Sequence, residues 1–153
     1  MDVKIWALEP MKLAYVEHVG PYQEVEVAWM KLASWAGEKG LFSERTKSYG
    51  VYYDNPLEVS AEKLRSEACI TLDKEVETAG DVKIRDVESG RYAVTAHLGS
   101  YDKLADSWME LCTKWLPESG EECTGGPCFE QYLNDPHATT PEHLVTILLL
   151  PIK

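Results

Sequence analysis

One glutamate is a candidate for ligand binding or catalysis because it lies within an apolar, strand-like segment. The alternation of residues 127–133 places Cys128, Glu130 and Tyr132 on one face of a strand. A carboxylate that loses its water on such a face needs a positive partner or a proton. The same glutamate on a solvated sheet face would need neither, and the residues alone leave both interpretations open.

Aromatic side chains could complete a site around this carboxylate. Three pairs are candidates: Tyr52 and Tyr132 on strands, Trp29 and Trp108 within helices, and Tyr22 and Tyr101 at helix starts. A tyrosine ring stacked on a flat cation contributes about 0.5–2 kcal/mol, and ordinary sheet packing is the alternative role for the strand pair. For the tryptophans we expect core packing, with the ceiling of a pocket as the alternative. The tyrosines at the helix starts are candidates for a pocket rim.

Histidines and cysteines in the chain have simpler explanations than catalysis or metal binding. His18 and His97 occupy equivalent places in two similar segments, which favours a shared structural role such as capping the turn from strand to helix. Cys123 and Cys128 are separated by four residues, with no second pair at metal-binding spacing. We therefore expect free, reduced thiols, no metal and no cofactor.

Composition narrows the class of partner. The 153 residues include 15 Lys and Arg against 26 Asp and Glu, a net charge of −11, and 44% are hydrophobic. That balance disfavours direct nucleic-acid binding and anionic membrane surfaces, and it permits a cationic ligand. The longest apolar stretch, residues 144–152, is too short to span a membrane, and the N-terminus has no apolar signal core. We expect a cytoplasmic protein.

The chain contains an internal repeat. Shifting the sequence by 79 residues superimposes Asp2-Val3-Lys4-Ile5 on an identical tetrapeptide, residues 81–84. The same shift aligns Trp29-Met30 with Trp108-Met109. A shift of 80 pairs Gly50 with Glu130 and Tyr52 with Tyr132. The sequence thus predicts one domain over residues 1–153, with one repeat at about 1–75 and a second at about 80–153.

Each repeat has the same order of predicted elements. The strands are expected at 3–8, 12–19, 49–54 and 66–72, and again at 82–87, 91–98, 127–133 and 144–150. A helix opens after Gly20-Pro21 and another after Gly99-Ser100, with apolar residues in steps of three and four. Gly37 and Gly40 are expected to end the first helix, and Pro117 and Gly120 the second.

This layout predicts an α+β fold built from a duplicated unit with pseudo-two-fold symmetry. Two such units joined edge to edge would form a curved antiparallel sheet with both helices on one face and a central cleft. The cleft would have a tyrosine on each wall, a carboxylate at Glu130 and bare backbone at Gly50, which leaves room for a ligand.

Several short motifs, in order along nearly the whole chain, resemble the gyrase-inhibitory-protein-like (GyrI-like) effector-binding domains. They are Gly20-Pro21-Tyr22, residues 51–56 (VYYDNP), 61–65 (AEKLR), 90–94 (GRYAV) and 127–134 (PCFEQYLN). The resemblance implies a duplicated βαββ fold. Related domains sense ligands in AraC-type and MerR-type multidrug regulators, where an acidic residue in an aromatic pocket binds lipophilic cations. The resemblance places that residue at Glu130.

Three functions follow as alternatives. The first is a binding module for bulky lipophilic, often cationic, compounds, and the second is inhibition or protection of DNA gyrase by protein contact. The third is hydrolysis of cyclopropanoid-type toxins, which the resemblance also implies, with Glu130 as general base and a tyrosine hydroxyl as acid. The first and third functions use the same residues, so the sequence does not separate them.

Overall fold

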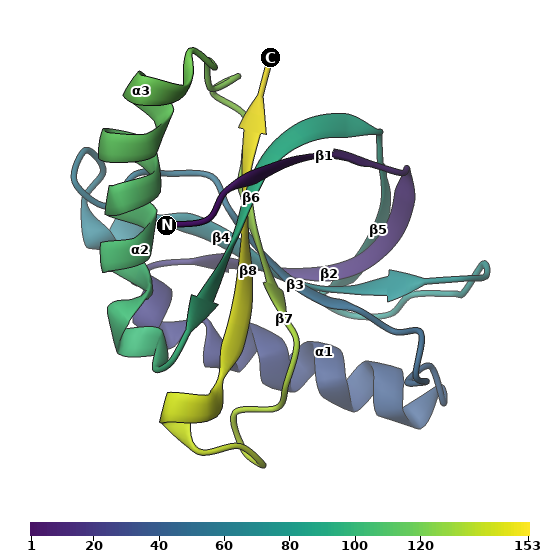
Figure 1. The fold of residues 1–153 in the computed structure, drawn as a ribbon. Coiled ribbons are helices and arrows are strands. Elements are labelled where there is room, and N and C mark those ends of the chain that lie inside the picture. The colour runs from purple at the N-terminus through teal and green to yellow at the C-terminus, as the bar shows by residue number, and fades with distance from the viewer. The chain divides into compact units, whose positions relative to one another are not determined.

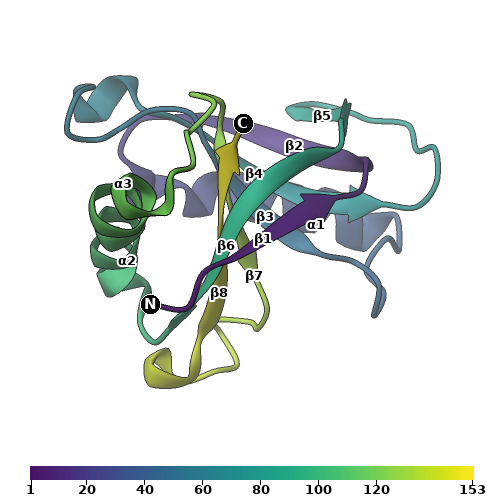
Figure 2. The same ribbon diagram turned by 45° about the horizontal axis from the view of Figure 1, so that its top comes forward.

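The computed structural model describes residues 1–153, which form two compact units. Unit 1 combines Met1–Leu8 with Gly90–Lys153, and unit 2 is Glu9–Ser89. These units do not coincide with the sequence repeats, because the first strand of each repeat pairs outside its own repeat. Strand β1 (Lys4–Leu8) pairs antiparallel with β6 (Gly90–Leu98), as Figure 2 shows, and β5 (Val82–Val87) pairs with β2 (Met11–Val19).

Unit 2 is a four-stranded antiparallel sheet with one helix. The strand order is β3-β4-β2-β5, where β3 is Ser48–Tyr52 and β4 is Arg65–Leu72. Helix α1 (Glu26–Glu38) follows a 3₁₀ turn at Tyr22–Glu24 and lies against the sheet (Figure 1). Its Leu32 and Ala36 pack on Val16 and Ile70 of the strands. The helix therefore covers the sheet face to which even-numbered residues of β2 and β4 point.

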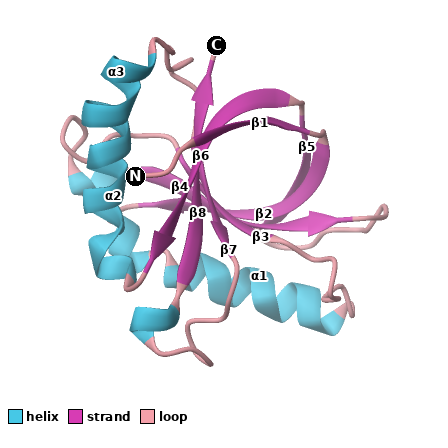
Figure 3. Ribbon diagram, viewed as in Figure 1, coloured by secondary structure: helices cyan, strands magenta, loops and turns pink.

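Unit 1 repeats this arrangement with the order β1-β6-β8-β7. Strand β7 is Cys128–Tyr132 and β8 is Val145–Ile152. The helical run consists of α2 (Leu104–Glu110), a π-helical turn at Leu111–Trp115 and α3 (Leu116–Ser119), all drawn as helix in Figure 3. Leu111 packs against Ala93, Leu148 and Leu150 of the sheet. The predicted α+β class and all eight predicted strands are confirmed, with strand ends displaced by at most two residues.

Two residues predicted to end helices lie inside them. Gly37 is within α1, which continues to Glu38, because glycine lowers helix stability without preventing the helical conformation. Pro117 does not stop the second helix but lies within its last turn. A proline inside an α-helix clashes with the carbonyl four residues earlier and lacks an N–H. The π-helical turn precedes it, with the N–H of Leu116 bonded to the carbonyl of Leu111, so the wider turn accommodates the proline. The helix ends instead at Gly120, whose φ of 80° is left-handed.

The helices are short, and none is both long and apolar enough to cross a membrane.

Successive side chains of a strand point to opposite faces of the sheet, so every second residue of a strand faces the helix. On β7 this rule selects Glu130, which lies opposite Leu148 of β8 and so points to the side of the sheet that α2 covers. The fold of unit 1 thus holds a carboxylate beneath a helix.

Candidate ligand-binding site

Glu130 is buried in unit 1, with only 5% of its surface exposed. The indole Nε1–H of Trp108 donates a hydrogen bond of 2.7 Å to its Oε2, and the hydroxyl of Tyr132 donates one of 2.7 Å to its Oε1. Hydrogen bonds to an ionised acceptor are among the stronger ones in proteins. Both donors are neutral groups, and together they fix the orientation of the carboxyl group.

The wall beside Glu130 is aromatic. The ring of Tyr101 lies 5.7 Å from that of Tyr132 at an angle of 58°. Burial raises the pKa of Tyr101, and the negative charges of Glu130 and Asp135 raise it further. Tyr101 therefore remains a neutral phenol at physiological pH, and this side of the site holds aromatic surface and one carboxylate.

The equivalent residues of unit 2 form an aromatic cluster with glycine at the acidic position. Gly50 of β3 lies opposite Ala68 of β4, at the place that Glu130 occupies in unit 1. The rings of Tyr22 and Tyr52 meet edge to face with centroids 4.9 Å apart, and the Tyr22 hydroxyl donates to the carbonyl of Asp54 over 2.7 Å. Trp29 is partly buried against the core beneath α1.

The structure therefore brings the predicted residues together within each unit. Glu130, Tyr132, Trp108 and Tyr101 meet in unit 1, and Tyr22 meets Tyr52 in unit 2. Trp108 packs on the core, as expected, and it also donates a hydrogen bond to the site carboxylate, while its place in the ceiling of a pocket stays a prediction. Nothing in the residue pattern signals the hydrogen bond, because the two residues are 22 positions apart and on different elements. The central cleft stays a prediction.

The paired histidines have the structural role expected of them. Nε2 of His18 lies 3.0 Å from the carbonyl oxygen of Pro21, and Nε2 of His97 lies 2.9 Å from that of Ser100. Both rings thus close the same turn between strand and helix. All four cysteines are free thiols, and burial raises the pKa of Cys128 to about 12. No group of three or more His, Cys, Asp or Glu residues within 1–153 is arranged to hold a metal ion.

Sequence reasoning missed a buried ion pair in unit 2. Glu67 is 6% exposed, and its Oε1 lies 2.5 Å from Nη2 of Arg85, while the Tyr53 hydroxyl donates to its Oε2 over 2.9 Å. The guanidinium also lies 4.6 Å from the ring centroid of Tyr15. These residues occupy the sheet face opposite α1 and tie edge strand β5 to β4. Shifted by 79 or 80 residues, they correspond to Ile147, Trp6, Leu133 and Val94, so the repeat carries no sign of the pair.

Comparison with known proteins identifies relatives over the whole chain. A family model described as "GyrI-like small molecule binding domain" matches residues 1–153. A "DNA gyrase inhibitor" of Edwardsiella piscicida is 32% identical over 145 residues, covering 91% of each chain. The "Probable transcriptional regulator YgiV" of Escherichia coli is 25% identical over 99% of this chain and 96% of its own.

Two solved structures share the fold at low sequence identity. The EcmrR C-terminal domain superimposes with a TM-score of 0.81 at 14% identity, covering 99% of this chain and 97% of its own. SAV2435, solved bound to tetraphenylphosphonium, gives 0.68 at 17% identity, with 100% and 94% covered. The two structural similarities establish the fold of the chain. The family to which the chain belongs is established by the match to the family model.

Proposed function

The chain belongs to the GyrI-like small-molecule-binding domains, and on that premise we propose that it binds bulky lipophilic cations at the site around Glu130. The observation that carries the proposal is the burial of this carboxylate between two neutral hydrogen-bond donors. Removing a charged group from water is costly, and a cation brought by the ligand compensates for that loss. The site is therefore suited to a ligand that combines a positive charge with apolar surface.

Aromatic surface supplies the second half of the recognition. The rings of Trp108, Tyr132 and Tyr101 lie around the carboxylate, and aromatic faces attract cations by about 0.5–2 kcal/mol each. Burial of the ligand's own apolar surface adds roughly 25 cal/mol per Å². A protein of the same fold, SAV2435, has been solved with tetraphenylphosphonium, which has this combination of charge and aromatic surface.

A charge-selective binding experiment tests the proposal. The purified chain is titrated with tetraphenylphosphonium and with triphenylphosphine oxide, a neutral aromatic compound of similar chemistry. Glu130→Gln keeps the shape of the side chain and removes its charge, so we expect the affinity for the cation to fall by about tenfold or more, an energy of about 1.4 kcal/mol. The affinity for the neutral compound should stay constant or rise, because no carboxylate then has to be buried.

Glu67→Gln is the matched control. It removes the other buried carboxylate, which already has Arg85 as its cationic partner, and so it should leave cation affinity unchanged where the variant is folded. Undiminished cation binding by Glu130→Gln would refute the proposal. Equal losses in the two variants would also refute it, because they would indicate a general destabilisation.

Inhibition of DNA gyrase is the second candidate, and the names of the curated relatives favour it. The net charge of −11 is compatible with contact to a basic surface of a DNA-binding enzyme. Purified gyrase assayed for DNA supercoiling at increasing concentrations of this chain tests it directly. A dose-dependent loss of supercoiling supports the candidate, and unchanged supercoiling at a large molar excess of the chain rejects it.

Hydrolysis at Glu130 is the third candidate. The Tyr132 hydroxyl donates to the carboxylate over 2.7 Å, so a group that could take a proton from water and a group that could give one to a leaving group lie side by side. The binding experiment separates this candidate from simple capture when the bound compounds are analysed for products. Turnover that Glu130→Gln loses while it still binds the compound would favour the hydrolase.

A further inference from the structure

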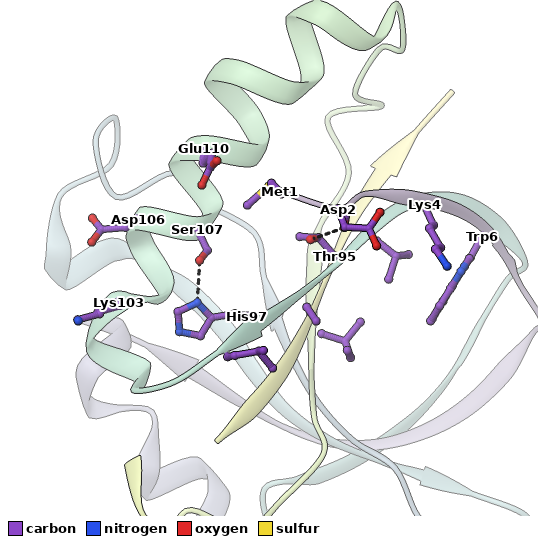
Figure 4. A pocket seen from close by; sticks show the side chains of 14 residues that line it. Met1, Asp2, Lys4, Trp6, Thr95, His97, Lys103, Asp106, Ser107 and Glu110 are labelled. Atoms are coloured by element: carbon purple, nitrogen blue, oxygen red, sulfur yellow. Dashed lines mark hydrogen bonds between the residues drawn. The ribbon is translucent and has the colours of Figure 1, made fainter. Parts of the chain in front are cut away.

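Strand β1 is a free edge of the sheet in unit 1. It pairs with β6 along one side, in a register that places Trp6 opposite Tyr92, and no strand pairs with its other side. The Thr95 hydroxyl donates a hydrogen bond of 2.8 Å to the carbonyl oxygen of Asp2 and so holds the segment that leads into β1 (Figure 4). A free edge presents a row of backbone N–H and C=O groups that can pair with another strand.

The free edge of unit 2, strand β5, is protected by charged side chains, and β1 is not. The two strands share the residue pair Lys-Ile, but β5 continues with Arg85 and Asp86 where β1 has Trp6 and Ala7. Both charged residues of β5 form ion pairs, Arg85 with a carboxylate of β4 and Asp86 with an ammonium group of β2. Charges on an edge strand discourage pairing with another chain, so β1 lacks a protection that its counterpart has.

The side chains of β1 are mostly apolar and are exposed on both faces of the sheet. Ile5 is 43% exposed and Trp6 is 44% exposed. Ile5 lies opposite Ala93, which packs beneath the helical run, so Ile5 and Ala7 point to the helix-covered face. Lys4 and Trp6 point to the other face, and Figure 4 shows their side chains extending from the strand in the same direction. A strand paired with this edge would therefore bury apolar surface on both faces.

The edge is complementary to itself. Trp6 is the middle residue of the five in β1, so an antiparallel pair of two β1 strands about a two-fold axis at Trp6 matches all five residues of each strand. In this register Ile5 lies opposite Ala7 of the second copy, a large side chain against a small one, and Lys4 lies opposite Leu8. The two Trp6 rings lie opposite each other, and an aromatic pair contributes about 0.5–1.5 kcal/mol beyond the area that it buries.

We propose that the chain forms a symmetric dimer in which β1 pairs antiparallel with β1 of a second copy and continues the sheet of unit 1 into that copy. The two-fold axis gives both copies the same contacts. Five residues from each copy make a small interface, and interfaces under about 1,200 Å² are typical of weak, reversible complexes. We therefore expect a monomer–dimer equilibrium with a Kd between about 10 µM and about 500 µM.

The dimer surface is distinct from the site proposed for cations. Glu130 is on β7, and the strand order β1-β6-β8-β7 places β7 and β1 at opposite ends of unit 1. Dimerisation is therefore expected to occur without a bound ligand, and Glu130→Gln should leave the Kd of the dimer unchanged.

Sedimentation equilibrium of the full chain, at concentrations from about 1 µM to about 1 mM, measures the association. Trp6→Lys removes the aromatic pair and places two ammonium groups opposite each other at the axis, so we expect the Kd to rise at least about tenfold. The variant should fold, because lysine is common on natural edge strands. Met109→Lys is the matched control: it introduces the same charge at a residue of α2 that is 51% exposed, and the Kd should not change.

Mixing two variants tests the register. When Trp6→Lys and Trp6→Glu chains are combined in equal amounts, opposite charges face each other across the axis. Opposite charges at paired positions of antiparallel strands stabilise by about 0.2–1 kcal/mol, whereas like charges destabilise, so the mixture should dimerise about fivefold more tightly than either variant alone. A mixture that associates no more tightly than its components would overturn the proposed register.

The salt dependence of the Kd needs no variant. Each copy carries a net charge of −11, so two copies repel each other. Salt shortens the range of this repulsion from about 30 Å at about 0.01 M to about 3 Å at about 1 M, and backbone and apolar contacts do not depend on it. The Kd should therefore fall as sodium chloride is added. A monomer at every concentration, a dimer that Trp6→Lys leaves intact or that Met109→Lys weakens equally, or a dimer that salt dissociates would each overturn the proposal.

Discussion

The hydrogen bond from Trp108 to Glu130 predicts a specific loss of stability when the donor is removed. Trp108→Phe keeps an aromatic ring and deletes the Nε1–H that donates to the buried carboxylate. Hydrogen bonds to charged groups contribute about 1.5–3 kcal/mol. Replacement of a tryptophan by phenylalanine also removes packing volume, so the hydrogen bond can be measured only against a variant that loses the same atoms without it.

Trp35 of α1 provides that comparison. It is 8% exposed, and its Nε1 is buried without a hydrogen-bond partner. Trp35→Phe therefore loses the same packing volume and no hydrogen bond. We expect Trp108→Phe to be less stable than Trp35→Phe by about 1.5–3 kcal/mol, which corresponds to roughly 3–12 °C in melting temperature for a chain of this length.

Urea denaturation followed by circular dichroism at 222 nm measures both variants, and equal m-values make the two free energies of unfolding comparable. Circular dichroism is preferred to tryptophan fluorescence because each variant removes one of five tryptophans. Free energies of unfolding that agree within about 0.5 kcal/mol would refute the reasoning, because the loss of a hydrogen bond to a buried carboxylate has to cost more than that.

Two further predictions concern the pH dependence of stability at Tyr53 and the effect on stability of replacing two glycines by alanine. Burial, together with the negative charge of Glu67, raises the pKa of Tyr53 to about 12, whereas an unfolded chain ionises its tyrosines near about 10. Between these values the unfolded state loses the proton first, so the free energy of unfolding should fall as pH rises from about 10 to 12. Tyr53→Phe should make this decline shallower in melts at stepped pH, and an unchanged slope would contradict the assignment. Gly120→Ala should lower stability by about 1 kcal/mol, since its φ of 80° is left-handed. Gly37→Ala within α1 should instead raise it by about 0.5–1 kcal/mol, and thermal melts of both variants check the contrast.

Much of the fold follows from local pattern. The strands repeat with a period of two and the helices in steps of three and four, and both patterns depend only on which residues must be shielded from water. The same reasoning placed Glu130 and Tyr132 on one face of β7, and their side chains do share a hydrogen bond there. The repeat also predicted equivalent roles for His18 and His97, which both close a turn through Nε2.

The pairing of the first strands could not be predicted in this way. Residues 2–5 and 81–84 are identical, so neither segment carries a local preference for one sheet over the other. In the structure β1 joins unit 1 and β5 joins unit 2. Which sheet each of these two strands joins depends on the register of all the strands and on side chains that differ between the repeats. One such contact is that of Arg85 on β5 with Glu67 on β4.

The sequence by itself determined the duplicated α+β layout, the family and the position of a carboxylate on the helix-facing side of a strand, because these depend on spacing along the chain. Only the tertiary structure decided which groups meet that carboxylate and which meet His97. Trp108 reaches Glu130 from 22 residues away, and Ser107 reaches His97 from ten. Such contacts depend on where a helix lies over a sheet, and that placement results from the packing of the entire core.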